Sequence, residues 1–231
     1  MITKRFKDQE LEVFNYGEFK ATEELPINEI SECIDKLAAL QKQCGQEDLD
    51  RLMSFYRDGK VGEMLGFGVV NTSKRGVDCK HPYAPLYLEC KSIGIRDAAF
   101  NKWAVSFSNL YKEKVKMFQD KKVWTAISFW EGNQVDFIFF GQHRGLGDFF
   151  KERLKSVTHG AINACICASS FIKKYNFKII AVSKSKEEVI EQLLSLCPSF
   201  ENLDKKVIEL KDFRLEDQSP YARRVLIERG L

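Results

Sequence analysis

The sequence predicts an α/β fold in which a mixed central sheet is flanked by helices, with further helical elements at the N-terminus. Three observations support this prediction. Runs with helical and with strand periodicity alternate along the chain. Two strongly apolar runs, KVWTAISFW and QVDFIFFG, are separated only by EGN, which indicates a β-hairpin. A helix–strand–helix order follows, and elements in this succession typically form a layered α/β sandwich.

The composition is that of a globular protein. Of the 231 residues, 44% are apolar and 30% are charged, which excludes a disordered or fibrous chain and suffices for a sizeable core. We expect one domain over residues 1–231, made of an N-terminal helical extension (1–47), a core (48–182) and C-terminal helices (183–231). The net charge of +3 neither requires nor excludes a polyanionic partner, because a local basic face matters more than the total.

Cysteine usage and hydropathy predict a cytoplasmic protein with no membrane association. The seven cysteines are odd in number and include no CxxC pair, which favours reduced thiols. The first residues lack the apolar core of a signal peptide, and no stretch reaches the ~18 apolar residues of a membrane span.

The first part of the chain predicts two helices and then strands. In LPINEISECIDKLAALQKQCG, apolar residues recur on one helical face and Gly45 is placed to end the helix. A second helix begins near Asp48, and Gly59 and Gly62 weaken its end. Short strands are expected at LGFGVV and VDC, separated by the turn NTSKRG, and a longer strand is expected at LYLECKSI.

The clearest predicted helix runs from about Asp97 to Phe118. Its apolar side chains keep a 3.6-residue period, namely Phe100, Trp103, Ala104, Phe107, Leu110, Tyr111, Val115 and Phe118. After the hairpin, helices are predicted at DFFKERLKSV and AINACICASSFIKKY, with a break at His159-Gly160 between them.

The last part of the chain predicts a strand and two helices. FKIIAV has the composition of a strand. In SKSKEEVIEQLLSL, Ser185 and Glu188 have the spacing of a helical capping box. SPYARRVLIERG places serine before proline, as is typical of a helix start.

The strand predicted at LYLECKSI carries charges inside an apolar run. Side chains alternate across a strand, so Glu89 and Lys91 share one face while Leu88 and Cys90 share the other. Asp78 comes shortly before and could bring a second carboxylate to the same place. Neighbouring carboxylates repel, and a divalent cation such as Mg²⁺ removes that repulsion. Lys91 beside the cation would orient or deprotonate a water and stabilise charge on a phosphate.

The run GVDCKHPYAPLYLECKSIG resembles the core of the PD-(D/E)XK nuclease superfamily, and its Y-x-E-x-K-S-I segment is especially similar to certain type II restriction endonucleases. The resemblance implies a restriction-endonuclease-like core in residues 48–182. It implies that Asp78 and Glu89 hold the metal, that Lys91 acts on the water, and that Glu63, from the preceding helix, is a further acid of the catalytic site. Val77 departs from the pattern, since the family name has proline there.

The same resemblance implies a Mg²⁺-dependent, site-specific deoxyribonuclease of restriction-modification type that hydrolyses phosphodiester bonds in double-stranded DNA. A homodimer is implied as well, because two strands need two active sites and a palindromic target mirrors a two-fold axis. Two alternatives remain open. The first is a repair, phage or structure-selective nuclease with the same site. The second is a non-catalytic DNA-binding or interaction protein in which the acid–lysine strand is coincidental.

Two polar loops are candidates for DNA contact. Ser73, Lys74 and Arg75 lie in the predicted turn before Asp78, where their side chains suit phosphate contacts. The loop GQHRGLG contains Gln142, His143 and Arg144, which have the donors and acceptors to contact base edges.

Overall fold

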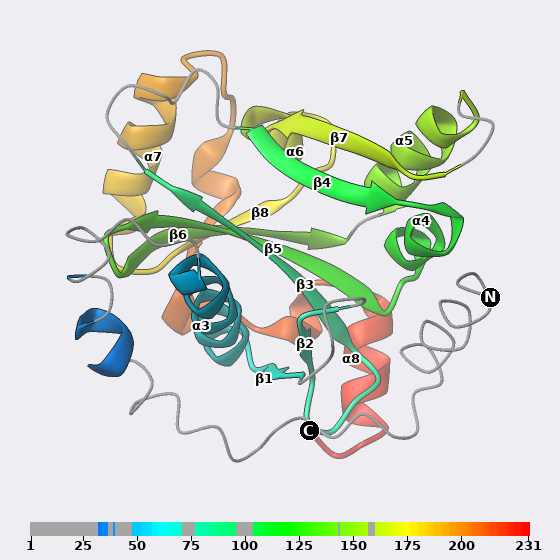
Figure 1. The fold of residues 1–231 in the computed structure, drawn as a ribbon. Helices are drawn as coiled ribbons and strands as arrows, with labels where there is room; N and C mark the ends of the chain where they lie inside the picture. The colour runs from blue at the N-terminus through cyan, green and yellow to red at the C-terminus, as the bar shows by residue number, and fades with distance from the viewer. Residues whose placement is uncertain are drawn as a thin grey trace.

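The computed structural model describes residues 32–36, 39, 48–70, 77–95, 104–142, 144–156 and 160–231. Within these ranges the chain forms a mixed α/β structure, as predicted (Figure 1). Residues 32–36 are helical and Ile34 is fully buried, while most of the predicted first helix lies outside the described residues.

A seven-stranded sheet forms the centre of the described part of the chain, in the order β1-β2-β3-β5-β6-β8-β9. The neighbours β3 and β5 are parallel, as are β8 and β9, and every other pair is antiparallel. The mixed sheet predicted from sequence is therefore confirmed. The strands are β1 (Gly68–Val69), β2 (Cys79–Lys80), β3 (Tyr87–Gly94), β5 (Val123–Glu131), β6 (Gln134–Gln142), β8 (Lys178–Ala181) and β9 (Val207–Glu209).

A separate two-stranded sheet pairs β4 (Ala104–Leu110) with β7 (Ile162–Cys167). Both segments were predicted to be helical, and that prediction is wrong. Phe107 and Ala164 are buried and lie opposite each other, while exposed residues alternate with the buried ones along both strands. A period of two was therefore present locally, but each segment also matched a helical period, and only their pairing selects the strand.

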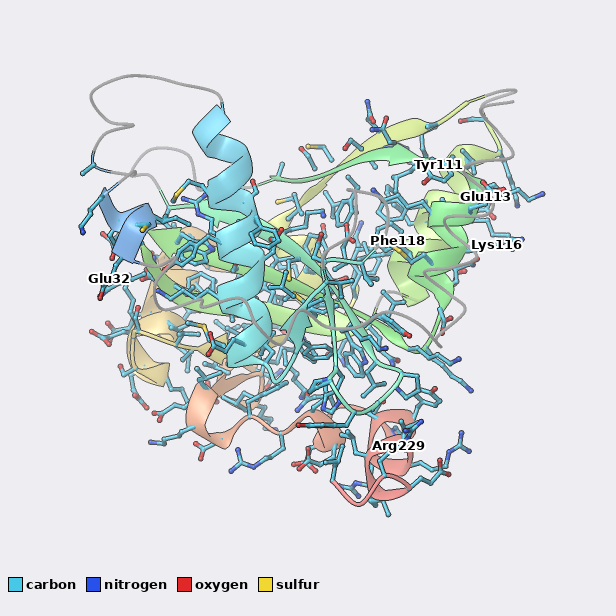
Figure 2. The ribbon with its side chains drawn as sticks, turned by 60° about the horizontal axis from the view of Figure 1, so that its bottom comes forward. Glu32, Tyr111, Glu113, Lys116, Phe118 and Arg229 are labelled. Carbon is cyan, nitrogen blue, oxygen red and sulfur yellow. The ribbon has the colours of Figure 1, made fainter. Side chains whose placement is uncertain are left out.

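The predicted long helix is accordingly shorter. A register shift follows Phe107, Asn109 has φ +54°, and helix α4 (Lys112–Gln119) begins after this irregularity. Phe118 points from α4 toward the core, whereas Lys116 lies on its outer side (Figure 2). The part of the predicted helix before Ala104 lies outside the described residues.

Helices cover both faces of the main sheet (Figure 1). One face packs against α3 (Asp48–Met64) and α8 (Pro220–Ile227), and this cluster includes Leu88 and Cys90 of β3. The other face packs against the two-stranded sheet and the remaining helices, and this cluster includes Tyr87 of β3. These helices are α4, α5 (Arg144–Leu154), α6 (Ala168–Lys173) and α7 (Lys186–Leu196).

The C-terminal segment adds a strand as well as helices. The capping box at Ser185 and Glu188 is present and starts α7, and the Ser219 side chain accepts a hydrogen bond from the Ala222 amide at the start of α8. Both helix starts are confirmed. The strand β9, which was not predicted, joins the edge of the main sheet beside β8. No helix in the described ranges combines the length and hydrophobicity that a membrane span needs.

Gly62 allows α3 to lie close to β2. A Cβ atom at this position would lie 2.6 Å from Cys79 Sγ and 3.2 Å from the Phe67 carbonyl oxygen. We expect Gly62→Val to lower the free energy of unfolding by about 1–3 kcal/mol, because the added carbons overpack this contact. Urea denaturation measures the loss. Gly94→Val is the control, since a Cβ there has no neighbour within 4 Å and valine suits a strand; equal losses in both variants would contradict the prediction.

Candidate metal centre

Asp78 lies where the hydrogen bonds between β2 and β3 end. Its backbone amide still donates to the Leu88 carbonyl at 2.9 Å, as the last rung of the ladder. Two residues further along β3, the Cys90 amide donates to the Asp78 carboxylate Oδ2 at 2.6 Å. The Asp78 carboxylate thus accepts the hydrogen bond that a backbone carbonyl of a neighbouring strand would otherwise accept. This bond fixes one carboxylate oxygen beside the backbone of Glu89 and Cys90.

Glu89 and Lys91 project together from β3, as the alternation predicted. Lys91 Nζ lies 2.6 Å from Glu89 Oε1 and donates to the Cys90 carbonyl at 2.9 Å. It also lies 5.8 Å from the centre of the Phe107 ring on β4, a cation–π distance. Glu89 is 3% exposed, and its Oε2 has no hydrogen-bond partner among the described residues.

Asp58, on α3, is a third acid of this group and was not singled out from the sequence. One of its carboxylate oxygens lies within 4.8 Å of a ligand atom of Asp78 and of Cys90 Sγ, and these two also lie within 4.8 Å of each other. The helix is held in place by Cys79, whose thiol donates to the Asp58 carbonyl at 3.3 Å. No local motif marks Asp58; the one available signal was its place in the helix that precedes the strands.

The three carboxyl groups and the lysine interact electrostatically. Burial, together with the negative charge of Glu89, raises the pKa of Asp58 to about 7, although Lys91 and Arg57 act in the opposite direction. Burial, Glu89 and Asp58 raise the pKa of Asp78 well above its ordinary value of 3.8. Burial disfavours the Lys91 ammonium, but the carboxylates of Glu89 and Asp78 outweigh it and raise the pKa of Lys91. The group therefore carries more acid than its one lysine can neutralise.

The structure brings together three of the four predicted catalytic residues, Asp78, Glu89 and Lys91. The fourth, Glu63, is exposed near the end of α3, and the α3 acid that faces the group is Asp58, more than one turn earlier. The helix register explains this difference, since residues five positions apart face different sides of a helix.

The candidate DNA contacts are only partly visible. Gln142 ends β6, two strands away from β3, and its side-chain amide donates to the Lys121 carbonyl at 2.7 Å. It lies opposite Trp124 and so projects from the face that carries α3 and α8, not from that of Glu89. The remaining positions, Ser73, Lys74, Arg75, His143 and the side chain of Arg144, lie outside the described residues.

The residues present suit a bound divalent cation. The carboxyl groups of Asp58 and Asp78 lie close together, the charge of Glu89 raises the pKa of both, and a buried oxygen of Glu89 lacks a hydrogen-bond partner in the described ranges. A cation would satisfy that oxygen and offset the repulsion among the acids. Carboxylate oxygens are hard ligands of the kind that Mg²⁺ binds.

The chain matches no protein-family model and no curated protein.

The contribution of Asp58 and Asp78 to stability should fall as the pH rises, because both hold protons more tightly in the folded than in the unfolded chain. The loss begins near the unfolded pKa of about 4 and, for Asp58, continues to about 7. In EDTA at pH 8, we expect the free energy of unfolding of Asp58→Asn to exceed that of the wild type by about 1–2 kcal/mol, after allowance for partial solvent exposure. At pH 4 the two proteins should differ little. Urea titrations at both pH values measure this.

Asp204→Asn is the control for that experiment, because Asp204 is exposed on a short 3₁₀ helix outside the acidic group. Between pH 4 and pH 8, its free energy of unfolding should change by the same amount as that of the wild type. An Asp58→Asn variant that shows the same pH dependence as the wild type would contradict the raised pKa.

Proposed function

We propose that this protein is a Mg²⁺-dependent DNA endonuclease of restriction type. The observation that supports it is an acidic group at the point where β2 parts from β3. Asp58 and Asp78 lie close together there, and Glu89, which is paired with Lys91, interacts electrostatically with both. An acidic group with an adjacent lysine suits metal-assisted hydrolysis of a phosphodiester. DNA as the substrate follows from the resemblance of the segment that holds Asp78, Glu89 and Lys91 to type II restriction endonucleases.

Asp78 and Glu89 would hold the cation, and Asp58 would complete its acidic surroundings. When bound, Mg²⁺ supplies an electrophile that acidifies a water and offsets negative charge on the phosphate. The protein contributes the fixed positions of the carboxylates. Asp78 is held by the Cys90 amide, and Glu89 is held by Lys91, so neither has to be ordered when the substrate arrives.

Lys91 would orient the attacking water and stabilise the charge that develops on the scissile phosphate. Its ammonium is held by Glu89 and by the Cys90 carbonyl, with 26% of the side chain exposed, so one donor remains available to a ligand. The raised pKa favours the charged form, which suits charge stabilisation. The ammonium form of Lys91 cannot accept a proton from the attacking water, so in this form Lys91 acts by its charge and by its hydrogen bonds.

Cleavage of both DNA strands requires two such sites. We therefore propose a homodimer whose two-fold axis coincides with that of a palindromic target, which is the simplest arrangement of two identical sites on a duplex.

The direct test is incubation of the purified protein with plasmid and phage DNA, in Mg²⁺ and in EDTA. We expect discrete fragments in Mg²⁺ and intact DNA in EDTA. A smear would support a nuclease without sequence preference instead. Absence of Mg²⁺-dependent cleavage on a panel that includes flaps, junctions and ends would overturn the nuclease proposal and favour a binding protein.

Lys91→Ala and Asp78→Asn should each reduce the Mg²⁺-dependent cleavage rate by at least about 100-fold, since each removes a charge that acts on the metal or the phosphate. The measurement is the initial rate at saturating DNA, with circular dichroism to check folding. Wild-type rates in folded Lys91→Ala would exclude this lysine from the mechanism.

Asp58 and Glu63 form a matched pair on one helix. Asp58→Asn should lower the cleavage rate by at least about ten-fold, because Asp58 faces the metal site, whereas exposed Glu63→Gln should leave it near the wild-type value. Rates of both variants over a Mg²⁺ titration measure this. The opposite ranking would return Glu63 to the site and remove Asp58.

A further inference from the structure

We propose that Asp58, Asp78 and Cys90 also form a binding site for a thiophilic divalent cation, Zn²⁺, which excludes Mg²⁺ from the candidate active site. The Zn²⁺ site itself rests only on the positions of these three side chains. Its inhibitory consequence rests on the function proposed above.

The geometry comes from three different elements. Asp58 is on α3, Asp78 precedes β2, and Cys90 is in the middle of β3, yet one ligand atom from each lies within 4.8 Å of the other two. Zn–O and Zn–S bonds measure about 2.0–2.3 Å, so the ligands of one ion lie at most about 4.5 Å apart. A small movement of side chains is enough to close the site around an ion.

The sulfur donor distinguishes this site from the Mg²⁺ site. Mg²⁺ prefers oxygen ligands, whereas a thiolate with two carboxylates suits Zn²⁺, which generally binds such donors more tightly. Cys90 faces the side of the sheet covered by α3, whereas Glu89 faces the other side. Asp78 stands at the edge between them, held by the amide that links the two residues. Both sites need Asp78, so the two ions compete.

Cys90 lies against the part of α3 that carries Asp58. Its thiol is 3.8 Å from the Asp58 carbonyl, to which the neighbouring Cys79 thiol also donates, at 3.3 Å, so both sulfurs lie against α3 at the residue that supplies a carboxylate. Zn²⁺ would bind the Cys90 sulfur as a thiolate, with release of its proton to solvent.

Co²⁺ serves as the probe, because it takes Zn²⁺ sites and reports sulfur ligation. We expect the full-length, EDTA-treated protein to develop a near-ultraviolet sulfur-to-cobalt charge-transfer band on titration with Co²⁺. Added Zn²⁺ should displace the Co²⁺ and abolish the band, and the competition yields the Zn²⁺ affinity. In cleavage assays at fixed Mg²⁺, Zn²⁺ should lower the wild-type rate.

Cys90→Ala should remove the band and weaken Zn²⁺ binding by at least about ten-fold. Asp58→Asn, which keeps the thiol, should weaken Zn²⁺ binding similarly. This variant tests the site even if Cys90→Ala does not fold. Cys165→Ser is the matched control, since Cys165 is exposed on β7, away from the acidic group. It should keep the band, the affinity and the response of cleavage to Zn²⁺.

A wild-type protein that binds Co²⁺ without the band, or a band that persists in folded Cys90→Ala, overturns the Zn²⁺ site. The two proposals fail separately. Mg²⁺-dependent cleavage without the band leaves the nuclease and removes the Zn²⁺ site. A Cys90-dependent band without cleavage of any DNA leaves the Zn²⁺ site and removes the nuclease.

Discussion

The hydrogen bond from the Cys90 amide to the Asp78 carboxylate holds the candidate site together. At this point β2 stops pairing with β3, and a backbone amide would otherwise lack an acceptor. A buried amide without a partner is costly, so the carboxylate is bound firmly where the two strands part. One local requirement of sheet structure therefore also sets the position of a charged group that is available for chemistry.

The other members of the site gather around this bond through strand alternation and helix packing. Glu89 and Lys91 lie on either side of Cys90 along β3 and share the face opposite to it. Asp58 arrives from α3, which Gly62 allows to pack closely against Cys79. The resulting concentration of acid is unfavourable for folding, as the raised pKa values of Asp58 and Asp78 indicate. Shifted pKa values caused by burial and by neighbouring charges are typical of functional sites.

Predictions from local pattern succeeded where one segment carried the whole signal. The strand at LYLECKSI, the hairpin of β5 and β6 and the capped start of α7 each depend on residues close in sequence, and all are present. Prediction failed for β4 and β7, because each became a strand only by pairing with the other, more than 50 residues away. It also missed β9, a three-residue strand stabilised by its neighbour β8.

The sequence by itself determined that Glu89 and Lys91 project together from an apolar strand, because alternation is a property of the strand alone. It also brought Asp78 close, because a short connection between antiparallel strands limits the distance between them. Only the tertiary structure decided which acid of α3 joins them. Asp58 and Glu63 are both acidic and lie on the same helix, and the choice depends on how that helix is rotated and packed against β2. Such packing is set by contacts among distant residues, which no local pattern records.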